Sequence, residues 1–213
     1  IHGELGPFAA SVDRVGVEFL GSFPAGGGNL GPLQLDARFK PPSGIGLSIS
    51  GGGITGGGFL YLDPDKGEYA GGLELQFQEF IHIKAVGILN TKMPDGSDGF
   101  SLLVIITAEF VPIQLGFGFT LIGVGGLLGV NRTALYEELR LGVRDGSLNS
   151  ILFPKDIVAN APRIISDLKR IFPPLGGRFL IGPMGKLGWG TPALITLELG
   201  VILEIPRPAF AIL

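Results

Sequence analysis

The side chains that carry most enzyme chemistry are scarce in this chain. It has two histidines, His2 and His82, and no cysteine. A nucleophilic triad needs a histidine that the fold holds beside the nucleophile, and protein zinc sites are built mainly from cysteine and histidine. His82 lies in a strand-like segment beside Lys84, which is typical of a half-exposed strand residue. We therefore predict no catalytic residues, no metal site and no cofactor.

Carboxylates are the remaining candidates for acid–base chemistry. Glu198 and Glu204 lie on one strand-like segment, where their spacing corresponds to about 20 Å, too far for two carboxylates to cooperate directly. We expect most strand glutamates on solvated faces or beside Arg and Lys. This group comprises Glu74, Glu79, Glu109, Glu198 and Glu204. The sequence thus favours a protein that is not an enzyme.

Two glycine-rich segments have the composition of phosphate-binding loops. Residues 123–129, GVGGLLG, come between an apolar strand and a helical pattern, but a dinucleotide-binding fingerprint would need glycine at Leu128. Residues 51–58, GGGITGGG, lack the Gly-Lys-Ser/Thr of a P-loop and favour a flexible connection or a flat strand. For the first segment the sequence favours a tight turn packed close to a helix, made by Gly123, Gly125, Gly126 and Gly129.

Polar residues adjoin this predicted turn. Asn131 and Arg132 follow it directly, and Lys186 and Trp189 flank apolar segments further along the chain. Charges in such apolar surroundings need partners, so Arg132, Lys186 and Trp189 are candidates for a buried polar cluster near the helices, with stabilisation of turns as the simpler alternative. Asn131-Arg132-Thr133 also matches a glycosylation acceptor, although Thr133 is better placed as a helix N-cap.

The composition limits the class of protein. Of 213 residues, 46% are hydrophobic and 16% are charged, which excludes a disordered chain and suffices for one β-rich domain over residues 1–213. The net charge of −3 and the lack of Lys/Arg clusters argue against nucleic-acid binding. The absence of cysteine excludes disulfides and leaves the cellular compartment open.

Long apolar strands dominate the chain. Residues 99–111 and 113–122 form two runs that we expect to meet at a hinge at Pro112. The first run is apolar on both faces, which is typical of a strand covered on both sides. In the second run Gly116 and Gly118 leave one face bare, and a helix is the simplest cover. Further strands are expected at 9–20, 33–40 (half-buried), 45–49, 59–62, 69–89, 178–181 and 193–205.

A helical period begins after Arg132. We expect one helix from an N-cap at Thr133 to a stop at Gly146, and a second opened by Asn160 and Pro162. The apolar stripe of the second helix contains Ile164, Ile165, Leu168, Ile171 and Phe172. The predicted fold class is therefore α+β and β-dominated. Long antiparallel amphipathic strands, arranged as hairpins or a meander, form a curved sheet, and a two-helix insert at about 133–172 packs on that sheet.

In the second half of the chain, turns, helices and the segment Gly-Trp-Gly-Thr-Pro follow a specific order. The stretches concerned are GFGFTLIGVGGLLGVNR (116–132), RDGSLNSILFPKDIVANAPRII (144–165) and FPPLGGRFLIGPMGKLGWGTPALITLELGVILEIP (172–206). This order resembles that of a domain family of unknown function, DUF6603, which occurs in large multidomain proteins. The resemblance implies no activity and no functional residues, and it supports the interpretation of residues 1–213 as part of a longer chain.

The surplus of apolar strand surface leads to a hypothesis on function. The sequence starts at Ile1 without methionine and stops in an apolar run, so we expect a fragment of a longer chain or ends that pair with another chain. The leading hypothesis is a non-enzymatic structural or assembly module. It would self-associate through apolar strand faces and open sheet edges into a larger homo-oligomer, such as a ring, tube or filament.

Two other functions fit the same pattern. A curved sheet could carry a lipid or another apolar ligand in a groove. An oligomeric β-barrel pore would place strands in a membrane, but its aromatic girdles contrast with one Trp and three Tyr against fifteen Phe. At this point a membrane partner remains an open alternative.

Overall fold

The computed structural model describes residues 2–145, 147–190, 193–206 and 208–213. Gly146, the predicted end of the first helix, and Thr191 and Pro192 of the Gly-Trp-Gly-Thr-Pro segment lie outside these residues. The strands and helices are β1 His2–Leu5, β2 Phe8–Asp13, β3 Gly16–Ser22, β4 Gln34–Lys40, β5 Gly44–Gly51, β6 Ile54–Asp63, β7 Glu68–Phe77, β8 Ile81–Lys92, β9 Asp98–Gly116, β10 Phe119–Arg132, α1 Tyr136–Asp145, the 3-10 helix η1 Ser147–Ser150, α2 Ala161–Ile171, β11 Pro174–Trp189, β12 Ile195–Ile205 and β13 Ala209–Ile212.

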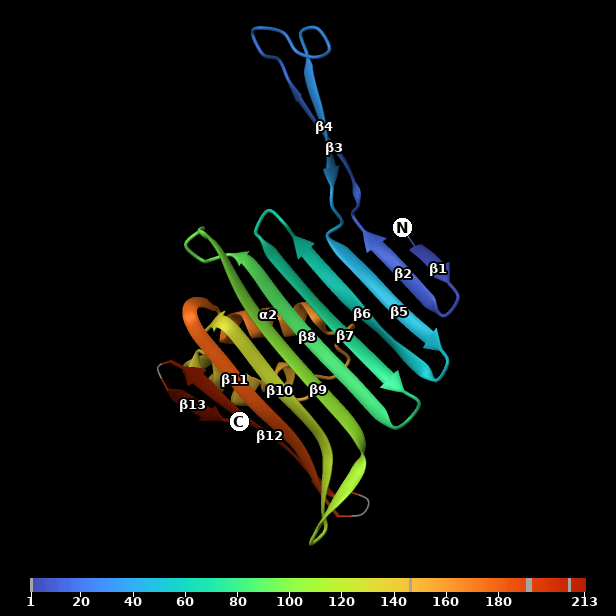
Figure 1. The fold of residues 1–213 in the computed structure, drawn as a ribbon, viewed down its shortest axis with the longest axis vertical. Helices are drawn as coiled ribbons and strands as arrows, with labels where there is room; N and C mark the ends of the chain where they lie inside the picture. The colour runs from blue at the N-terminus through green and yellow to red at the C-terminus, as the bar shows by residue number, and fades with distance from the viewer. Residues whose placement is uncertain (1, 146, 191–192, 207) are drawn as a thin grey trace.

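An eleven-stranded antiparallel sheet makes up most of the fold. Its order, β1-β2-β5-β6-β7-β8-β9-β10-β11-β12-β13, is a meander that is not closed into a barrel. The remaining two strands, β3 and β4, pair only with each other and form a hairpin that projects from the sheet between β2 and β5 (Figure 1). We call residues 16–40 the arm. The predicted fold class, a β-dominated α+β protein with long antiparallel strands and two helices, is confirmed.

Short turns explain why the strands follow one another as a meander. In GGGITGGG, Gly52 and Gly53 have φ of 62° and 78°, which an L-residue adopts only under strain, so the chain reverses there. The later glycines, Gly56 to Gly58, belong to β6. Both structural explanations of this segment, a connection and a glycine strand, thus apply to different parts of it.

The helical insert covers one face of the sheet. In Figure 1, α2 and its neighbours lie behind the strands. From the sheet, Val86, Ile88, Leu103, Ile105, Leu127, Leu180 and Ile202 enter a common core with Leu139, Ile151, Phe153, Ile157, Ile164, Leu168, Ile171 and Phe172 of the insert. We call this side of the sheet the helix face and the opposite side the open face.

The two helices begin differently from one another. Helix α2 follows Asn160 as N-cap, with Pro162 in its first turn, and buries the predicted apolar stripe, so this prediction is confirmed. Helix α1 begins at Tyr136, and the prediction of Thr133 as its N-cap is wrong. The Thr133 hydroxyl instead donates to Glu204 Oε1 at 2.9 Å, because β12 brings that carboxylate under the start of the insert.

The central hairpin differs most from its prediction. Strand β9 is continuous through Pro112, although its pairing with β10 is irregular between Glu109 and Ile113, and the chain turns at Phe117 and Gly118, which have φ of 51° and 81°. Residues 123–129 are not a turn but the middle of β10. An extended glycine segment and a glycine turn look alike in sequence, and only the register with β9 and β11 separates them.

Several strand boundaries also differ. The strand expected at 9–20 is divided at Arg14, and that at 69–89 at Gln78, each with positive φ. The strand expected at 178–181 extends over the whole of β11. Strand β4 is mostly exposed rather than half-buried, because it lies in the arm.

The most important correction to the sequence-based expectation concerns which face of the long strands the insert covers. Alternating residues of β12 from Ile195 to Ile205 form the apolar face that the sequence highlights, yet the insert packs on the opposite side of β12, against Gly200 and Ile202. Strand β9 is likewise covered on one side only, since Leu103 is buried and Ile106 is 51% exposed.

Candidate functional site

The open face is the largest unexplained surface of the molecule. Successive side chains of a strand point to opposite sides, and the ladders align one set from each strand on this face. Across its middle, register partners place Leu47, Gly58, Leu73, Ala85, Ile106, Gly126, Pro183, Val201 and Ile212 in one row. Residues on either side of the row continue the pattern.

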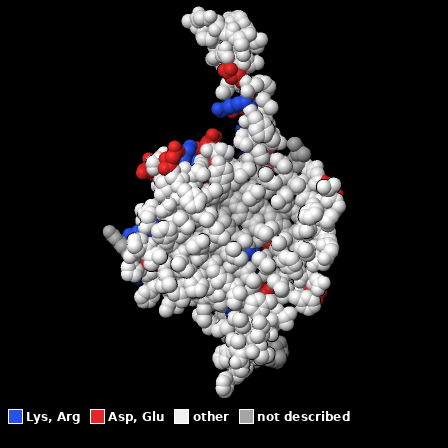
Figure 2. Space-filling view, viewed as in Figure 1, with Lys and Arg blue, Asp and Glu red and all other residues white. Residues whose placement is uncertain are grey.

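The composition of the open face is uniform. From β1 to β13 it contains Leu5, Phe8, Ala10, Val12, Ile45, Leu47, Ile49, Leu60, Leu62, Tyr69, Leu73, Leu75, Ile83, Ala85, Leu89, Leu102, Val104, Ile106, Ala108, Val124, Leu128, Val130, Phe179, Ile181, Pro183, Leu197, Leu199, Val201, Leu203, Ile205, Phe210 and Ile212, with glycines between them. No residue of this set is charged. In Figure 2 most charged side chains gather at the rim and on the lower part of the arm, and a few charged atoms are visible near the middle of the face.

The open face explains an excess of solvent-accessible surface. The chain exposes 12393 Å², whereas a compact monomer of 22.3 kDa is expected to expose about 9,400 Å². The excess of roughly 3,000 Å² includes the arm and the open face. The largest apolar patch on a typical soluble monomer measures about 300–600 Å², so the uncovered sheet face is unusual for a lone chain.

The helix face contrasts with the open face because it carries a row of alternating charges. Lys84 Nζ lies 3.9 Å from Glu74 and 3.1 Å from Glu109, and Lys186 Nζ lies 2.6 Å from Glu109 and 3.1 Å from Glu198. We call these five residues the charge ladder. It joins β7, β8, β9, β11 and β12 and ties the sheet to the insert, since Glu74 accepts a hydrogen bond from the Ile157 amide and Lys186 lies 5.5 Å from the centre of the Phe153 ring.

Gly123 makes the charge ladder continuous. It lies on β10, between Glu109 on β9 and Lys186 on β11, at matching register positions. A Cβ at this position would come within 2.9 Å of the Ala108 carbonyl oxygen and 3.0 Å of the Phe153 ring. The missing side chain therefore lets the Lys186–Glu109 pair span a strand and lets Phe153 pack over it.

Opposing effects set the pKa values in the charge ladder. Burial alone would raise the pKa of Glu109, but hydrogen bonds from Lys186 and Lys84 outweigh burial and hold it below the ordinary value of 4.5. Burial alone would lower the pKa of Lys186, but Glu109 and Glu198 hold it above 10.5. The Glu109 carboxylate stabilises the fold above pH 4.5 and the Lys186 ammonium below pH 10.5, so this ion pair contributes fully between these limits.

Replacing Glu109 by Gln is expected to lower the free energy of unfolding at pH 7 by about 2 kcal/mol, because two partly buried lysines lose a charged acceptor. The native contribution is lost as pH falls through the depressed pKa of Glu109, so the difference from the wild-type protein should shrink below pH 4.5. Urea unfolding at pH 7, 5 and 3.5 measures this. Glu18→Gln in the arm is the control and should leave stability unchanged; a Glu109→Gln difference that stays constant into acid would contradict the explanation.

Arg132 is fully buried at the junction of β10 and the insert. Its guanidinium donates to the Phe172 carbonyl oxygen at 2.8 Å and to Asn90 Oδ1. Phe172 is the C-cap of α2, where backbone carbonyls carry partial negative charge that a cation stabilises. Burial lowers the pKa of Arg132 to about 10, with the charge of Glu68 opposing the shift, so the side chain is cationic at pH 7.

Glu204 anchors the other end of the insert. Its carboxylate, 4% exposed as a residue, accepts hydrogen bonds from the Thr133 hydroxyl and the Ala134 amide and pairs with Arg178 at 3.3 Å. Arg132, Glu204 and the charge ladder thus hold the insert at three places. These contacts fix the insert over the middle of the helix face, while a cavity of about 1210 Å³ stays open between α2 and strands β2, β5 and β6.

The structure separates the residues predicted to form one cluster. Arg132 and Trp189 are at opposite ends of the β10–β11 ladder, paired with Pro174 and Phe119, and Lys186 belongs to the charge ladder. The prediction of one cluster is therefore wrong, although Arg132 and Lys186 each occupy a partnered polar site. Trp189 is 44% exposed, beside Gly118 of the hairpin turn.

The remaining predicted residues serve strand packing and a turn. Gly125 and Gly129 point to the helix face, where a Cβ would meet Thr107 and Leu180, whereas Gly126 points to the open face. Asn131 has φ of 52°; its side chain donates to the Phe100 carbonyl and accepts from the Gly177 amide, and so it stabilises the end of β10.

The expectation that strand glutamates lie beside Arg or Lys is confirmed for Glu74, Glu109, Glu198 and Glu204. Sequence reasoning missed that the first three join through Lys84 and Lys186 into one ladder. The signal that could have revealed the ladder is a single charged residue at a similar position along each of several otherwise apolar strands, such as Glu109 and Lys186. Their partnership depends on strand order, which the sequence does not state. Within the described part of the chain no group of three or more His, Cys, Asp or Glu could hold a metal ion, and no helix there is long and apolar enough to cross a membrane.

The fold defines a class: a β-dominated α+β protein with a large open antiparallel sheet, a helical insert packed on one sheet face and an apolar, uncovered opposite face. The chain belongs to DUF6603, a family of unknown function, whose family model matches residues 1–213. The match covers the whole chain, whereas the resemblance noted in the sequence covers the second half. Neither the curated proteins nor the solved structures include a match.

Proposed function

We propose that this protein is a non-enzymatic assembly module and that its open face packs against the open face of a second copy. The observation that carries the proposal is the charge-free open face of eleven strands. Strands about 4.8 Å apart and roughly ten residues long give this face about 1,500 Å². A stable interface needs about 800 Å² per partner, and obligate homodimers bury 2,000 Å² or more in total.

Sheet-on-sheet packing is the arrangement that suits two such faces. Apolar inner faces of two sheets interdigitate at a separation of about 10 Å in ordinary β-sandwiches. A two-fold axis would bring the same surface of both copies together, so one apolar face suffices for both partners. A specific polar ligand, by contrast, would require placed hydrogen-bonding groups, which the open-face set lacks apart from the Tyr69 hydroxyl.

Three glycines of the open face support a close approach from outside the chain. A Cβ at Gly185 would meet nothing within 4 Å, and the nearest atoms to a Cβ at Gly87 and Gly126 are carbonyl oxygens at 3.7 Å. Glycine in a strand is destabilising by about 0.5–1 kcal/mol relative to alanine. This chain leaves room for a side chain at all three positions, and their small size supports a close contact with a second copy.

The oligomeric state of the wild-type protein tests the proposal. Sedimentation velocity and light scattering should show a dimer or a larger multiple at protein concentrations of about 1 to 100 µM. This range is on the order of the dissociation constants of moderate interfaces. A protein that stays monomeric and soluble at the highest concentration would disprove it.

Gly126→Val and Gly185→Val are expected to separate folding from association. Each valine adds a β-branched side chain where the monomer has space, so the melting temperature measured under dissociating conditions should stay equal or rise. Dimer affinity should fall about tenfold or more, because the new side chains occupy the space of the partner. Gly176→Val, outside the open-face set, is the matched control. Unchanged affinity in both open-face variants would count against close packing at these glycines.

Carriage of an apolar ligand is a second candidate, favoured by one observation. The open face is hollowed over β1, β2 and β5 to β7 into a trough of about 530 Å³ lined by Leu5, Phe8, Leu47, Leu73 and Leu75, among others, within the usual range for ligand sites. Native mass spectrometry of gently purified protein distinguishes the two: a monomer with co-purifying lipid supports carriage, and a lipid-free dimer supports assembly.

A further inference from the structure

The arm is an amphipathic two-stranded ribbon. Its register pairs Val17 with Phe39 and Phe19 with Ala37 on one face, and Glu18 with Arg38 and Leu20 with Asp36 on the other. The polar face is held by the Glu18–Arg38 ion pair at 2.7 Å. The large side chains of the apolar face, Val17, Phe19 and Phe39, instead stay exposed to solvent.

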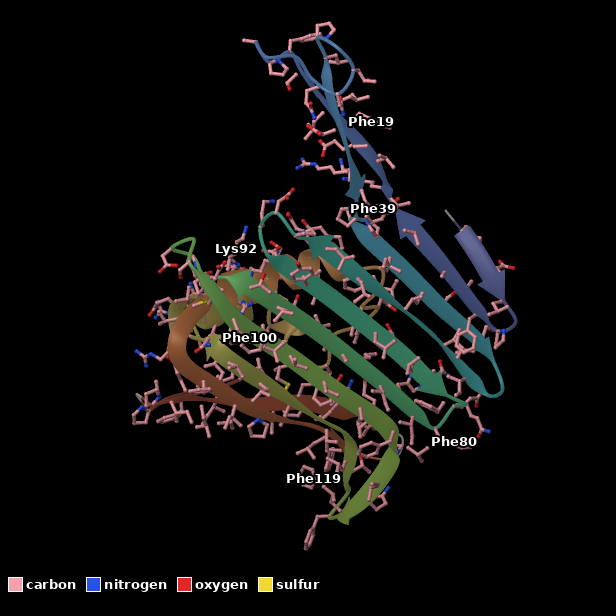
Figure 3. All side chains as sticks on the ribbon, turned by 45° about the horizontal axis from the view of Figure 1, so that its top comes forward. Phe19, Phe39, Phe80, Lys92, Phe100 and Phe119 are labelled. Carbon is pink, nitrogen blue, oxygen red and sulfur yellow. The ribbon has the colours of Figure 1, made fainter. Side chains whose placement is uncertain are left out.

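The large apolar side chains of the arm face solvent. Phe19 is 64% exposed and Phe39 66%, and Figure 3 shows Phe19 on the arm clear of the sheet and Phe39 at the base of the arm. Phe23 and Leu30 near its tip are also exposed. A two-stranded hairpin is marginally stable in water by itself, and the arm gains little from the body from which it projects (Figure 1). A contact on its apolar face would supply the missing burial.

The size of the arm decides what kind of partner it can hold. Two strands of about seven residues present roughly 240 Å² on one face, far less than the 800 Å² or so that a stable interface needs from each partner. The arm therefore cannot retain an independent protein. It can add to an interface that is already formed by a neighbouring surface.

The open face is that neighbouring surface. The arm leaves the sheet between β2 and β5, directly after Val12 and Ile45, which form the last apolar pair of the open face at this end. An interface that covers the open face up to this pair is continuous with the base of the arm. The arm extends beyond its own sheet (Figure 1), so a second copy seated on the open face up to Val12 and Ile45 lies next to the base of the arm.

We propose that the arm of each copy clasps the second copy, with Val17, Phe19 and Phe39 packed against it. This inference rests on the proposed self-association and adds to it a specific clamp. Two-fold symmetry makes the contact reciprocal, so each dimer has two arms engaged. The apolar area of both arms then adds to that of the paired open faces.

The double variant Phe19→Ser/Phe39→Ser tests the clamp. Its dimer dissociation constant, measured by sedimentation, should rise about tenfold or more, since interface aromatic residues carry much of the binding energy. Its melting temperature under dissociating conditions should not change. Leu20→Ser is the matched control, because Leu20 is 45% exposed on the polar face of the arm, and its affinity should equal that of the wild type.

An arm-less variant gives a second measurement. Asp13 and Gly44 are register partners, so an Asn-Gly turn can replace residues 14–43 and close β2 and β5 as a hairpin. Its dimer should also be weaker. If both arm variants dimerise as tightly as the wild type while Ile106→Lys on the open face does not, the clamp is wrong and the self-association stands; if the wild type is monomeric, both are wrong.

A cross-link identifies what the arm touches. The chain has no cysteine, so Leu30→Cys can carry a single benzophenone label at the exposed tip. Irradiation of a mixture of ¹⁴N- and ¹⁵N-labelled chains should yield peptide pairs that join light and heavy chains. Cross-links confined to one chain would overturn the inference.

Discussion

Ile106→Lys is expected to abolish dimer formation over the concentration range in which the wild-type protein associates. Ile106 lies on β9 in the middle row of the open face and is 51% exposed in the single chain. Two-fold packing would bury a lysine from each copy among apolar side chains, at several kcal/mol for each charge. A combined loss of 4 kcal/mol or so corresponds to roughly a thousandfold weaker association.

The folded monomer should tolerate this substitution. A lysine at an exposed strand position can keep its ammonium in water while its stem covers apolar surface, so circular dichroism and the melting temperature of the dissociated protein should resemble those of the wild type. Leu141→Lys is the control, because Leu141 is 45% exposed on α1, away from the open face, and should leave the dimer intact. A dimer of unchanged affinity in the Ile106 variant would place the interface elsewhere.

Arg132→Ala should cause the largest loss of stability, about 3–5 kcal/mol. The substitution empties the volume of a fully buried side chain and removes the donors to the Phe172 carbonyl and Asn90. The C-terminus of α2 would lose its cationic partner, so the insert should open more often. Urea unfolding at pH 7 measures the loss, and faster proteolysis within residues 133–173 would locate it.

Two further variants separate the causes. Arg132→Met keeps most of the volume without the charge, and a buried cation replaced by an apolar side chain often changes stability little, so its loss should be clearly smaller than that of alanine. Arg140→Ala, at an exposed i,i+3 pair on α1, should be neutral. Equal losses in the alanine and methionine variants of Arg132 would show that its hydrogen bonds, and not the cavity, decide the effect.

Local chemistry made part of this fold predictable. The Asn160–Pro162 start of α2 and its apolar stripe depend on nearby residues only. The glycines of β10 misled the prediction because their reason is not local: Gly123 is small so that Lys186 can reach Glu109 from two strands away. Arg14 and Gln78, which break two predicted strands with positive φ, carry no strong turn signal in their own identity.

The sequence likewise predicted one part of the candidate site, and only the tertiary structure decided the other. Alternation alone determined that strands such as β12 have an apolar face. Which face the insert covers was decided only by tertiary structure, because Gly200, Lys186 and Glu204 make the less apolar side the one that accepts Leu152, Phe153 and the start of the insert. Hydrophobicity is read residue by residue, whereas the partner of a sheet face depends on shape and paired charges contributed by strands far apart in the chain.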